Sequence, residues 1–379
     1  MAAPSTNSIV TTSPESVCAR DFPAAIVSTF FDKVGGIASF IAGMYRESIS
    51  RNDRIVFLSP NIRNPARKQT RIGGKGRLAQ LLCTFAALRE TKARYVQCHG
   101  AWYLQLGCIL HKWTERMLGR RVRLTFVSHS VVDLSHRPLA RRIFNALDNC
   151  ADGHAFVSDY LLEYYTTNNK YRFESRPKVI ELATSGADDR KPEDLKRIAE
   201  ALEPIRARGI AIVTYIGLVF YEGKYRGARM LLDAVAKLLA AGHSLHLAVA
   251  TGGDYFPQFM ADIEKRNLGG RVTVFSDLMP AEGLLDYSAL HCHISFQDAF
   301  PIVILEALRA GVPTLINDLG FGPRQDIDGL VRCPGNVDAI ASCAAAMLAQ
   351  APRVDTEYVR RHYHRSRVYD EFVEFLYLG

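Results

Sequence analysis

Two acidic residues, Asp298 and Glu306, have a spacing that suits ligand binding. Residues 290–295 read as a short buried strand, and residues 301–309 read as a helix that begins with proline, whose missing N–H costs nothing there. Asp298 then lies on the loop from strand to helix, and Glu306 lies one to two turns into the helix, so the helical part of the path between them spans only about 8–10 Å. Both acids can therefore face one crevice at the carboxyl edge of a parallel sheet, the usual ligand site of open α/β folds.

The helix N-terminus in this crevice favours a phosphate or diphosphate, through its free N–H groups and the helix dipole. Carboxylates beside it would accept hydrogen bonds from hydroxyl groups. A nucleotide-sugar carries both kinds of group and fits this layout. Taken alone, Asp298 could be a helix N-cap or a solvated loop acid, and Glu306 could form a surface ion pair.

The residues around these acids resemble a known family. Asp298 and Glu306 stand in the frame Ala-Phe-Pro-x4-Glu-Ala-x3-Gly-x-Pro, which resembles the E-x7-E region of retaining GT-B glycosyltransferases, above all glycosyltransferase family 4 (glycosyl transferases group 1). Residues 267–274 before this region, and residues 320–323 and 328–331 after it, are similar to the same family. The C-terminal half thus resembles the family almost continuously, and the N-terminal half does so in scattered pieces.

Strands rich in β-branched residues alternate with helical patterns twice along the 379 residues. This alternation predicts an α/β protein with two Rossmann-like parallel-sheet domains facing an interdomain cleft, and the resemblance makes the fold GT-B. We expect a disordered leader at residues 1–20, an N-terminal acceptor-binding domain at 21–190 and a C-terminal nucleotide-sugar-binding domain at 205–352. Residues 353–379 should contain one long helix, from 356 to 378, that crosses back to the first domain.

Composition and charge narrow the kinds of partner. The net charge of +8 favours anionic partners such as nucleotide diphosphates and lipid headgroups, and no nucleic-acid-binding module is visible. The eight cysteines contain no CxxC motif and read as reduced thiols. No apolar run is long enough to span a membrane, and the first residues lack a signal-peptide pattern. We expect a cytoplasmic protein, either free or bound peripherally to the inner face of the plasma membrane.

Metal binding has little support in the sequence. His291 and His293 share one face of a strand, but no partner cluster has the spacing of a metal site. We therefore expect no metal or other cofactor, with the nucleotide-sugar as a substrate.

Several residues acquire donor-binding roles from the resemblance. Gly217 ends a strand and is followed in the family by Arg, where this chain has Leu218. A family Lys-Gly pair that clamps the diphosphate corresponds here to Arg226 and Gly227, with Lys224 as a second charge. Arg can bind phosphate through two N–H groups, so Arg226 is a reasonable substitute. The donor-binding residues implied in this way are Glu306, Gly35, Gly36, Phe300, Ile302, Gly217 and Gly252.

Four residues are predicted to act on the reacting groups. Arg226 and Lys224 would neutralise the departing diphosphate, and Asp298 would hold hydroxyls of the transferred sugar. His129 ends a strand that resembles the family's strand near the donor sugar, although a histidine there is more often structural. Glu306 would bind the ribose.

The acceptor side is read from weaker signals. His99 also stands at a strand's carboxyl end, and the basic loop at residues 61–77 contains Arg63, Arg67 and Lys68. That loop is either solvated or in contact with an anionic acceptor or membrane surface.

Together these features predict a glycosyltransferase that acts on a growing polysaccharide or lipid-linked glycan and retains the anomeric configuration. Two alternatives remain open: a non-catalytic GT-B partner protein, favoured by Leu218, and a GT-B sugar-nucleotide epimerase.

Overall fold

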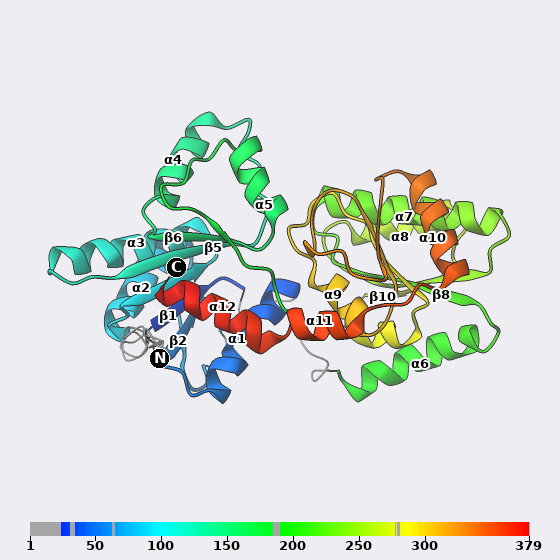
Figure 1. Cartoon of the computed structure of the whole chain (residues 1–379), viewed down its shortest axis with the longest axis horizontal. Coiled ribbons are helices and arrows are strands. Elements are labelled where there is room, and N and C mark those ends of the chain that lie inside the picture. The colour runs from blue at the N-terminus through cyan, green and yellow to red at the C-terminus, as the bar shows by residue number, and fades with distance from the viewer. Residues whose placement is uncertain are drawn as a thin grey trace, which may run out of the picture.

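The computed structural model describes residues 24–30, 35–62, 65–184, 190–276, 278 and 281–378. The expected leader at residues 1–20, the candidate acceptor residue Arg63 and residues 185–189 lie outside this described part. The chain forms two parallel sheets, one in each half, with helices packed on both (Figure 1). The prediction of an α/β protein with two parallel-sheet domains is confirmed.

The first sheet has seven parallel strands in the order β3-β2-β1-β4-β5-β6-β7. The order reverses between β1 and β4, and open α/β sheets bind ligands in the crevice at such a switch point. The strands are β1 Ala24–Ser28, β2 Ile55–Ser59, β3 Gln69–Arg71, β4 Tyr95–His99, β5 Arg123–Ser128, β6 Gly153–Phe156 and β7 Lys178–Val179. The helices are α1 Gly36–Ser50, α2 Arg77–Thr91, α3 Trp102–Met117, α4 Pro138–Asp148, α5 Asp159–Glu163 and the π-helix Tyr164–Asn168.

The second sheet has six parallel strands in the order β10-β9-β8-β11-β12-β13, with its own switch point between β8 and β11. The strands are β8 Ala211–Ile216, β9 Leu245–Ala250, β10 Val272–Phe275, β11 Leu290–His293, β12 Thr314–Asn317 and β13 Leu330–Cys333. The helices are α6 Pro192–Arg206, α7 Glu222–Ala240, α8 Phe256–Lys265, the 3-10 helix Glu282–Tyr287, α9 Ile302–Arg309 and α10 Val337–Gln350.

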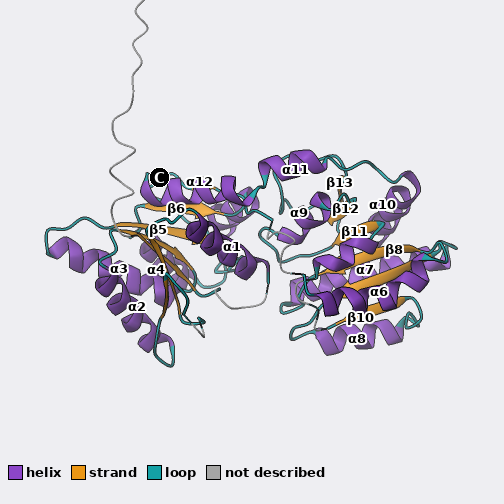
Figure 2. Ribbon diagram, turned by 90° about the horizontal axis from the view of Figure 1, so that it is seen from below, coloured by secondary structure: helices purple, strands orange, loops and turns teal. Residues whose placement is uncertain are grey.

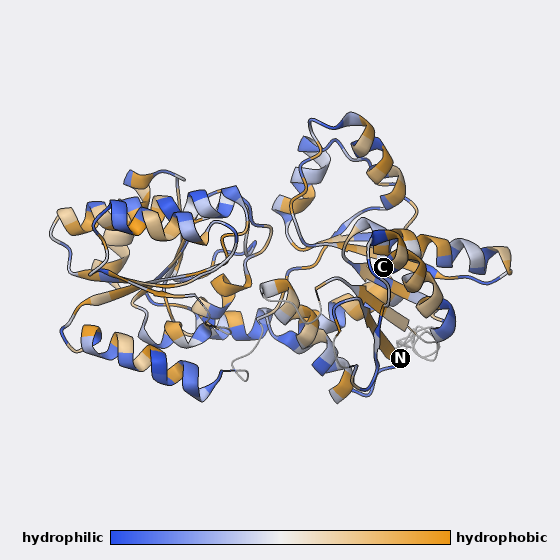
Figure 3. Cartoon of the chain, turned by 180° about the vertical axis from the view of Figure 1, so that it is seen from behind, coloured by the Kyte–Doolittle hydropathy of each residue, from blue (hydrophilic) through white to orange (hydrophobic). Residues whose placement is uncertain are grey.

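Apolar strands lie between helices whose outer faces are polar (Figure 3). In the first domain, α2 packs on α3 to form one covering layer, and α1 packs on α12 to form another. This arrangement buries the strands on both faces, which explains their nearly continuous apolar composition.

The C-terminal segment forms two helices, α11 Thr356–His362 and α12 Arg365–Tyr377, where the sequence predicted one. The break occurs because His364 acts as an N-cap, accepting a hydrogen bond from the backbone N–H of Ser366 at 3.3 Å. α11 packs on α9, whereas α12 packs on α1, β4 and β5. The chain therefore returns from the second sheet to the first (Figure 2).

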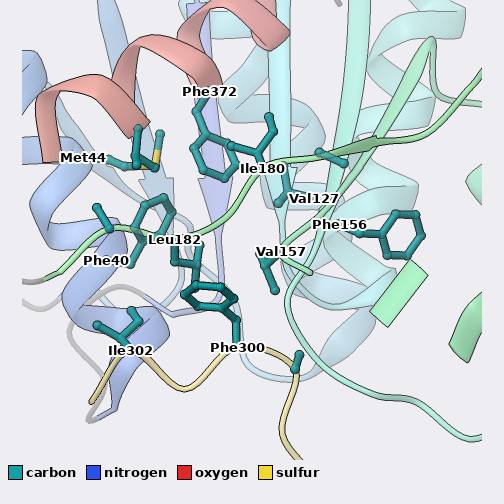
Figure 4. Close-up of a cluster of buried hydrophobic side chains, with 14 of the residues drawn as sticks. Phe40, Met44, Val127, Phe156, Val157, Ile180, Leu182, Phe300, Ile302 and Phe372 are labelled. Carbon is teal, nitrogen blue, oxygen red and sulfur yellow. The ribbon is translucent and has the colours of Figure 1, made fainter. Parts of the chain in front are cut away.

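Side chains from both domains share one hydrophobic cluster (Figure 4). Phe300 and Ile302, at the start of α9, lie in it with Phe40 of α1 and Leu182. Nearby, the Ser158 hydroxyl donates a hydrogen bond to the carbonyl oxygen of Ala299 at 2.8 Å. These contacts hold the first turn of α9 against the first domain.

Candidate functional site

Asp298 lies on the loop between β11 and α9, where the sequence placed it, and its two carboxylate oxygens have different partners. Oδ1 lies 2.6 Å from Nζ of Lys224, and Oδ2 lies 3.1 Å from Nε2 of His293. Burial alone would raise the pKa of Asp298, but the charge of Lys224 and the hydrogen bond from His293 outweigh it and hold the pKa well below its usual range. Asp298 is therefore ionised at neutral pH. We call Lys224, Asp298 and His293 the charged cluster.

Two glycines on one face of α7 bring Lys224 to Asp298. A Cβ atom at Gly227 would lie 2.0 Å from the carbonyl oxygen of Ile294, and one at Gly223 would lie 2.7 Å from Cβ of Gln297. The Gly223 carbonyl oxygen also accepts a hydrogen bond from the N–H of Phe296 at 3.1 Å. The first turns of α7 thus pack directly on the loop that carries Asp298.

The start of α7 differs from the sequence prediction. The resemblance to the family predicts a loop over residues 218–227, but the helix already begins at Glu222. Glycine is a poor helix former, but Gly223 and Gly227 allow close packing here. Both Lys224 and Arg226 therefore lie in the first turns of the helix.

Arg226 is exposed, and its guanidinium carbon lies 4.3 Å from the centroid of the Phe296 ring. This is the geometry of a cation–π contact. Among the described residues, no carboxylate within ion-pair distance of Arg226 is found. Its N–H groups are therefore available to an anion, in contrast to Lys224, which already holds Asp298.

Gly217 and Gly252, two of the predicted glycines, lie just beyond the ends of β8 and β9. The N–H of Gly217 donates to the carbonyl oxygen of Ala250 at 3.0 Å, which joins the ends of β8 and β9. A Cβ atom at Gly252 would lie 3.7 Å from Cδ2 of Leu218. An apolar side chain thus stands where the family resemblance would place a phosphate-binding arginine.

The helix starts of the two domains meet at Gly36 and Ile302. Gly35 has a φ of 124°, a conformation that suits glycine, and caps α1. A Cβ atom at Gly36 would lie 3.5 Å from Cδ1 of Ile302. The N-termini of α1 and α9 therefore lie close together, and their N–H groups form one region attractive to a phosphate.

Phe300 and Ile302 could meet a donor only through their backbone groups, because their side chains are buried in the cluster between the domains. Glu306 is half-buried in the second turn of α9, flanked by the buried residues Leu305 and Ala307.

His99 and His129, predicted separately, lie together at the ends of β4 and β5. Nδ1 of His99 lies 2.8 Å from Nε2 of His129, and both side chains are buried. Burial lowers the pKa of His129 to about 3, and burial with the neighbouring ring lowers the pKa of His99 well below its usual value. Both imidazoles are therefore neutral at physiological pH, and neither supplies positive charge to a ligand.

Arg67 and Lys68 lie away from the predicted acceptor side. One Arg67 N–H donates to Oδ1 of Asn52 at 3.1 Å, and Nζ of Lys68 donates to the carbonyl oxygens of Asp53 and Ser48. These partners precede β2, at the amino edge of the sheet, whereas His99 and His129 lie at the carboxyl edge. Residues 69–71 form β3, which runs parallel to β2, so Arg67 and Lys68 immediately before it lie at the amino edge of the sheet.

Two residues with structural parts in this region, His293 and Gln97, were missed by the sequence reading. His293 binds Asp298, and only its alternation with His291 in the strand hinted at a buried face. Gln97 hydrogen-bonds His99 at 2.7 Å, a contact for which the sequence gave no signal. Arg324, which stands where the family has an acid, pairs with Asp159 of the first domain.

A comparison with protein families finds a match for part of the chain. Residues 211–350 match the family model described as "Glycosyl transferases group 1", and this segment contains Lys224, Arg226, Asp298 and Glu306. No curated protein is similar enough in sequence to count as a relative.

Solved structures match nearly the whole chain. A glycosyltransferase from Rickettsia africae aligns with a TM-score of 0.69 at 13% identity, covering 93% of this chain and 98% of its own. HepE from Anabaena, in complex with UDP-glucose, aligns with a TM-score of 0.68 at 15% identity, covering 93% and 99%. WaaG, a glycosyltransferase involved in lipopolysaccharide biosynthesis, aligns with a TM-score of 0.65 at 14% identity, covering 94% and 100%. The chain therefore has the GT-B fold, and residues 211–350 in its second half are similar to glycosyl transferases group 1.

Proposed function

We propose that this protein is a metal-independent glycosyltransferase that moves a sugar from a nucleotide-sugar to an acceptor hydroxyl with retention of anomeric configuration. The observation that carries the proposal is the charged cluster next to the exposed Arg226, at the switch point of the second sheet and inside the family-matched segment. The complex of HepE with UDP-glucose supports a nucleotide-sugar as the ligand of this fold.

The charges of the site suit a departing diphosphate. Arg226 offers free N–H donors, and the N-termini of α1 and α9 add partial positive charge. Lys224 has three N–H donors, of which Asp298 takes one, so the ammonium can bridge Asp298 and a phosphate oxygen. Electrostatic stabilisation of this kind is usually the largest contribution to catalysis.

The reaction replaces one bond to the anomeric carbon by another. The bond to the diphosphate oxygen breaks, and its electron pair leaves with the nucleoside diphosphate. The acceptor oxygen bonds to the anomeric carbon on the same face, and its proton passes to the departing diphosphate. Asp298, which keeps unused lone pairs, would hold a hydroxyl of the sugar, Glu306 would bind the ribose, and Gly217 and Gly252 would border the nucleotide.

A transfer assay tests this proposal. UDP-, GDP- and ADP-linked sugars are incubated with the protein and polysaccharide or lipid-linked acceptors, and the product's anomeric configuration is read by proton NMR. We expect one donor to give a product of unchanged configuration without added metal, and an inverted product would contradict the proposal. Turnover of the donor without acceptor would instead favour the epimerase alternative, and no turnover with intact binding would favour a non-catalytic partner.

We further propose that the acceptor lies at an anionic membrane surface, as a lipid-linked or growing glycan, with the protein bound peripherally on the cytoplasmic side. The surface of α4 supports this, because no residue of this amphipathic helix is fully buried. Leu139 and Ile143 are 71% and 51% exposed, and Arg137 and Arg142 beside them are also exposed. Apolar side chains flanked by cations suit the interface of an anionic bilayer. None of the helices in the described part of the chain is both long and apolar enough to cross a membrane.

Vesicle flotation tests the membrane proposal. Wild type should float with vesicles containing phosphatidylserine more than with pure phosphatidylcholine, and Leu139→Ser combined with Ile143→Ser should reduce flotation several-fold. Leu378→Ser, at an exposed leucine beyond α12, is the matched control. Equal flotation of wild type with both lipids would contradict the proposal.

A further inference from the structure

A chain of buried hydrogen bonds runs from the C-terminal helix to His129. Nε2 of Gln97 donates to the carbonyl oxygen of Phe372 in α12 at 3.2 Å. Oε1 of Gln97 lies 2.7 Å from Nε2 of His99, and Nδ1 of His99 lies 2.8 Å from Nε2 of His129. All three side chains are buried. We call Gln97, His99 and His129 the histidine chain.

The carbonyl oxygen of Phe372, at one end of the histidine chain, determines where each proton in the histidine chain lies. The carbonyl oxygen of Phe372 can only accept, so the Gln97 amide must turn its N–H group towards it and its oxygen towards His99. Nε2 of His99 must then carry the proton, which leaves Nδ1 as an acceptor. That nitrogen in turn requires a proton on Nε2 of His129. Nδ1 of His129 is left as a bare acceptor.

Protonation of His99 would break this order. A proton on Nδ1 of His99 would face the N–H of His129, so two donors would meet at 2.8 Å. Protonation of His129 would add a proton only at its free Nδ1, but burial disfavours the charged form of both rings. The histidine chain therefore presents one neutral arrangement.

Nδ1 of His129 is buried and has no hydrogen-bond partner among the described residues. His129 follows β5, beside Phe30 beyond β1 and Phe40 of α1, at the carboxyl edge that faces the second domain. A bare acceptor at this place can be satisfied only by a donor, because a phosphate or carboxylate oxygen would meet its lone pair.

We infer that Gln97 is a positioning residue that fixes His129 as a hydrogen-bond acceptor and thereby selects a neutral sugar hydroxyl, rather than an anionic group, at this point of the donor site. The inference rests on the proposed function for the identity of the ligand as a sugar. The role of Gln97 in ordering the two histidines does not depend on it.

Ring-nitrogen NMR tests the ordering without any activity. In protein labelled with 15N-histidine, and assigned by single His→Gln variants, His99 and His129 should both show the neutral form with the proton on Nε2 down to about pH 5. A proton on Nδ1 of either residue, or a charged ring at pH 6, would overturn the inference even if donor binding were intact. Gln97→Met, which is similar in size but lacks the amide, should show mixed forms.

Binding measurements test the selection of a hydroxyl. Calorimetry with UDP-, GDP- and ADP-linked sugars and with the corresponding diphosphates would compare wild type, Gln97→Met and the control Gln105→Met on α3. Gln97→Met should weaken binding of the nucleotide-sugar on the order of tenfold, as expected for one lost hydrogen bond, and leave the diphosphate unchanged. Equal weakening of both ligands, or of neither, would overturn the inference. If no nucleotide bound the wild type, the proposed function would fail, and the NMR result would still decide the role of Gln97.

Discussion

The charged cluster of the second domain and the histidine chain of the first occupy equivalent places. Both lie at the carboxyl ends of strands next to a switch point of a parallel sheet, and both contain buried, hydrogen-bonded side chains. They differ in charge, because Asp298 has a lysine partner, whereas the histidine chain ends on a backbone carbonyl. A buried group keeps its charge only when a counter-charge is close. We infer a division of work in which Arg226 and Lys224 of the second domain meet the diphosphate, whereas His129 of the first domain meets a neutral sugar hydroxyl.

Removal of Asp298 should have the largest effect on this contrast. Asp298→Ala leaves Lys224 without its counter-ion, and breaking a buried pair from one side costs about 3 kcal/mol of unfolding free energy. The matched control is Asp338→Ala, since the Lys237–Asp338 pair has the same N–O distance of 2.6 Å but side chains that are 56% and 80% exposed, against 24% and 10% for Lys224 and Asp298. The control should lose about 0–1 kcal/mol in urea unfolding. Equal losses would show that the charged cluster is no more than a surface pair.

The pH dependence of the unfolding free energy tests the charge of Asp298 independently. Folding lowers the pKa of Asp298, so its contribution to stability is complete above the unfolded pKa of about 4 and is lost as the pH falls below it. The stability gap between wild type and Asp298→Ala should therefore narrow from about pH 5 to about pH 3. A constant gap would contradict the ionised state of Asp298.

Arg226→Ala should act on binding and leave stability nearly unchanged. The exposed guanidinium has no carboxylate partner among the described residues, so its loss should change the unfolding free energy by less than about 1 kcal/mol. Loss of its charged hydrogen bonds to phosphate should weaken nucleoside diphosphate binding about 10- to 100-fold. Arg229→Ala is a suitable control, because Arg229 is exposed on the same helix and also lies over an aromatic ring. Equal weakening in both variants would indicate a general effect of charge.

His129→Phe should show its effect only below about pH 7, as a change in the slope of the unfolding free energy against pH. Burial lowers the pKa of His129 to about 3 in the folded protein. Below the unfolded value of about 6.5, the unfolded state therefore binds a proton that the folded state does not bind, and the unfolding free energy decreases as the pH decreases. Between about pH 6 and 4 this contributes about 1.4 kcal/mol per pH unit. In His129→Phe, the slope of the unfolding free energy against pH should be shallower by about that amount between pH 6 and 4, and above pH 7 it should equal the wild-type slope. An unchanged slope would mean that His129 is charged or exposed in the folded protein.

The sequence predicted those features that depend on local pattern. The two series of strands and helices, the loop position of Asp298 and the helical position of Glu306 follow from apolar periodicity and proline placement. The contacts that define the two regions join residues far apart in the chain, such as Gln97 with Phe372 and Lys224 with Asp298. No local preference encodes such contacts.

The errors have equally physical causes. Residues 222–227 were read as part of a loop, although they form the first turns of α7, where tertiary packing requires glycine at 223 and 227. The last helix was read as continuous because a histidine N-cap is uncommon, and the weak edge strand β3 was read as loop. The contact of Arg324 with Asp159 joins the two domains and has no local signal in the sequence.

Nucleotide binding is the most direct test of the central claim. Calorimetry and thermal unfolding would compare nucleoside diphosphates and nucleotide-sugars, without metal, on wild type and Glu306→Ala. We expect one nucleotide-sugar to stabilise the wild type by about 2.7 kcal/mol at 100 times its dissociation constant, and this stabilisation to be lost in the variant. If no nucleotide bound the wild type, with or without metal, the glycosyltransferase proposal would be wrong and a non-catalytic role would replace it.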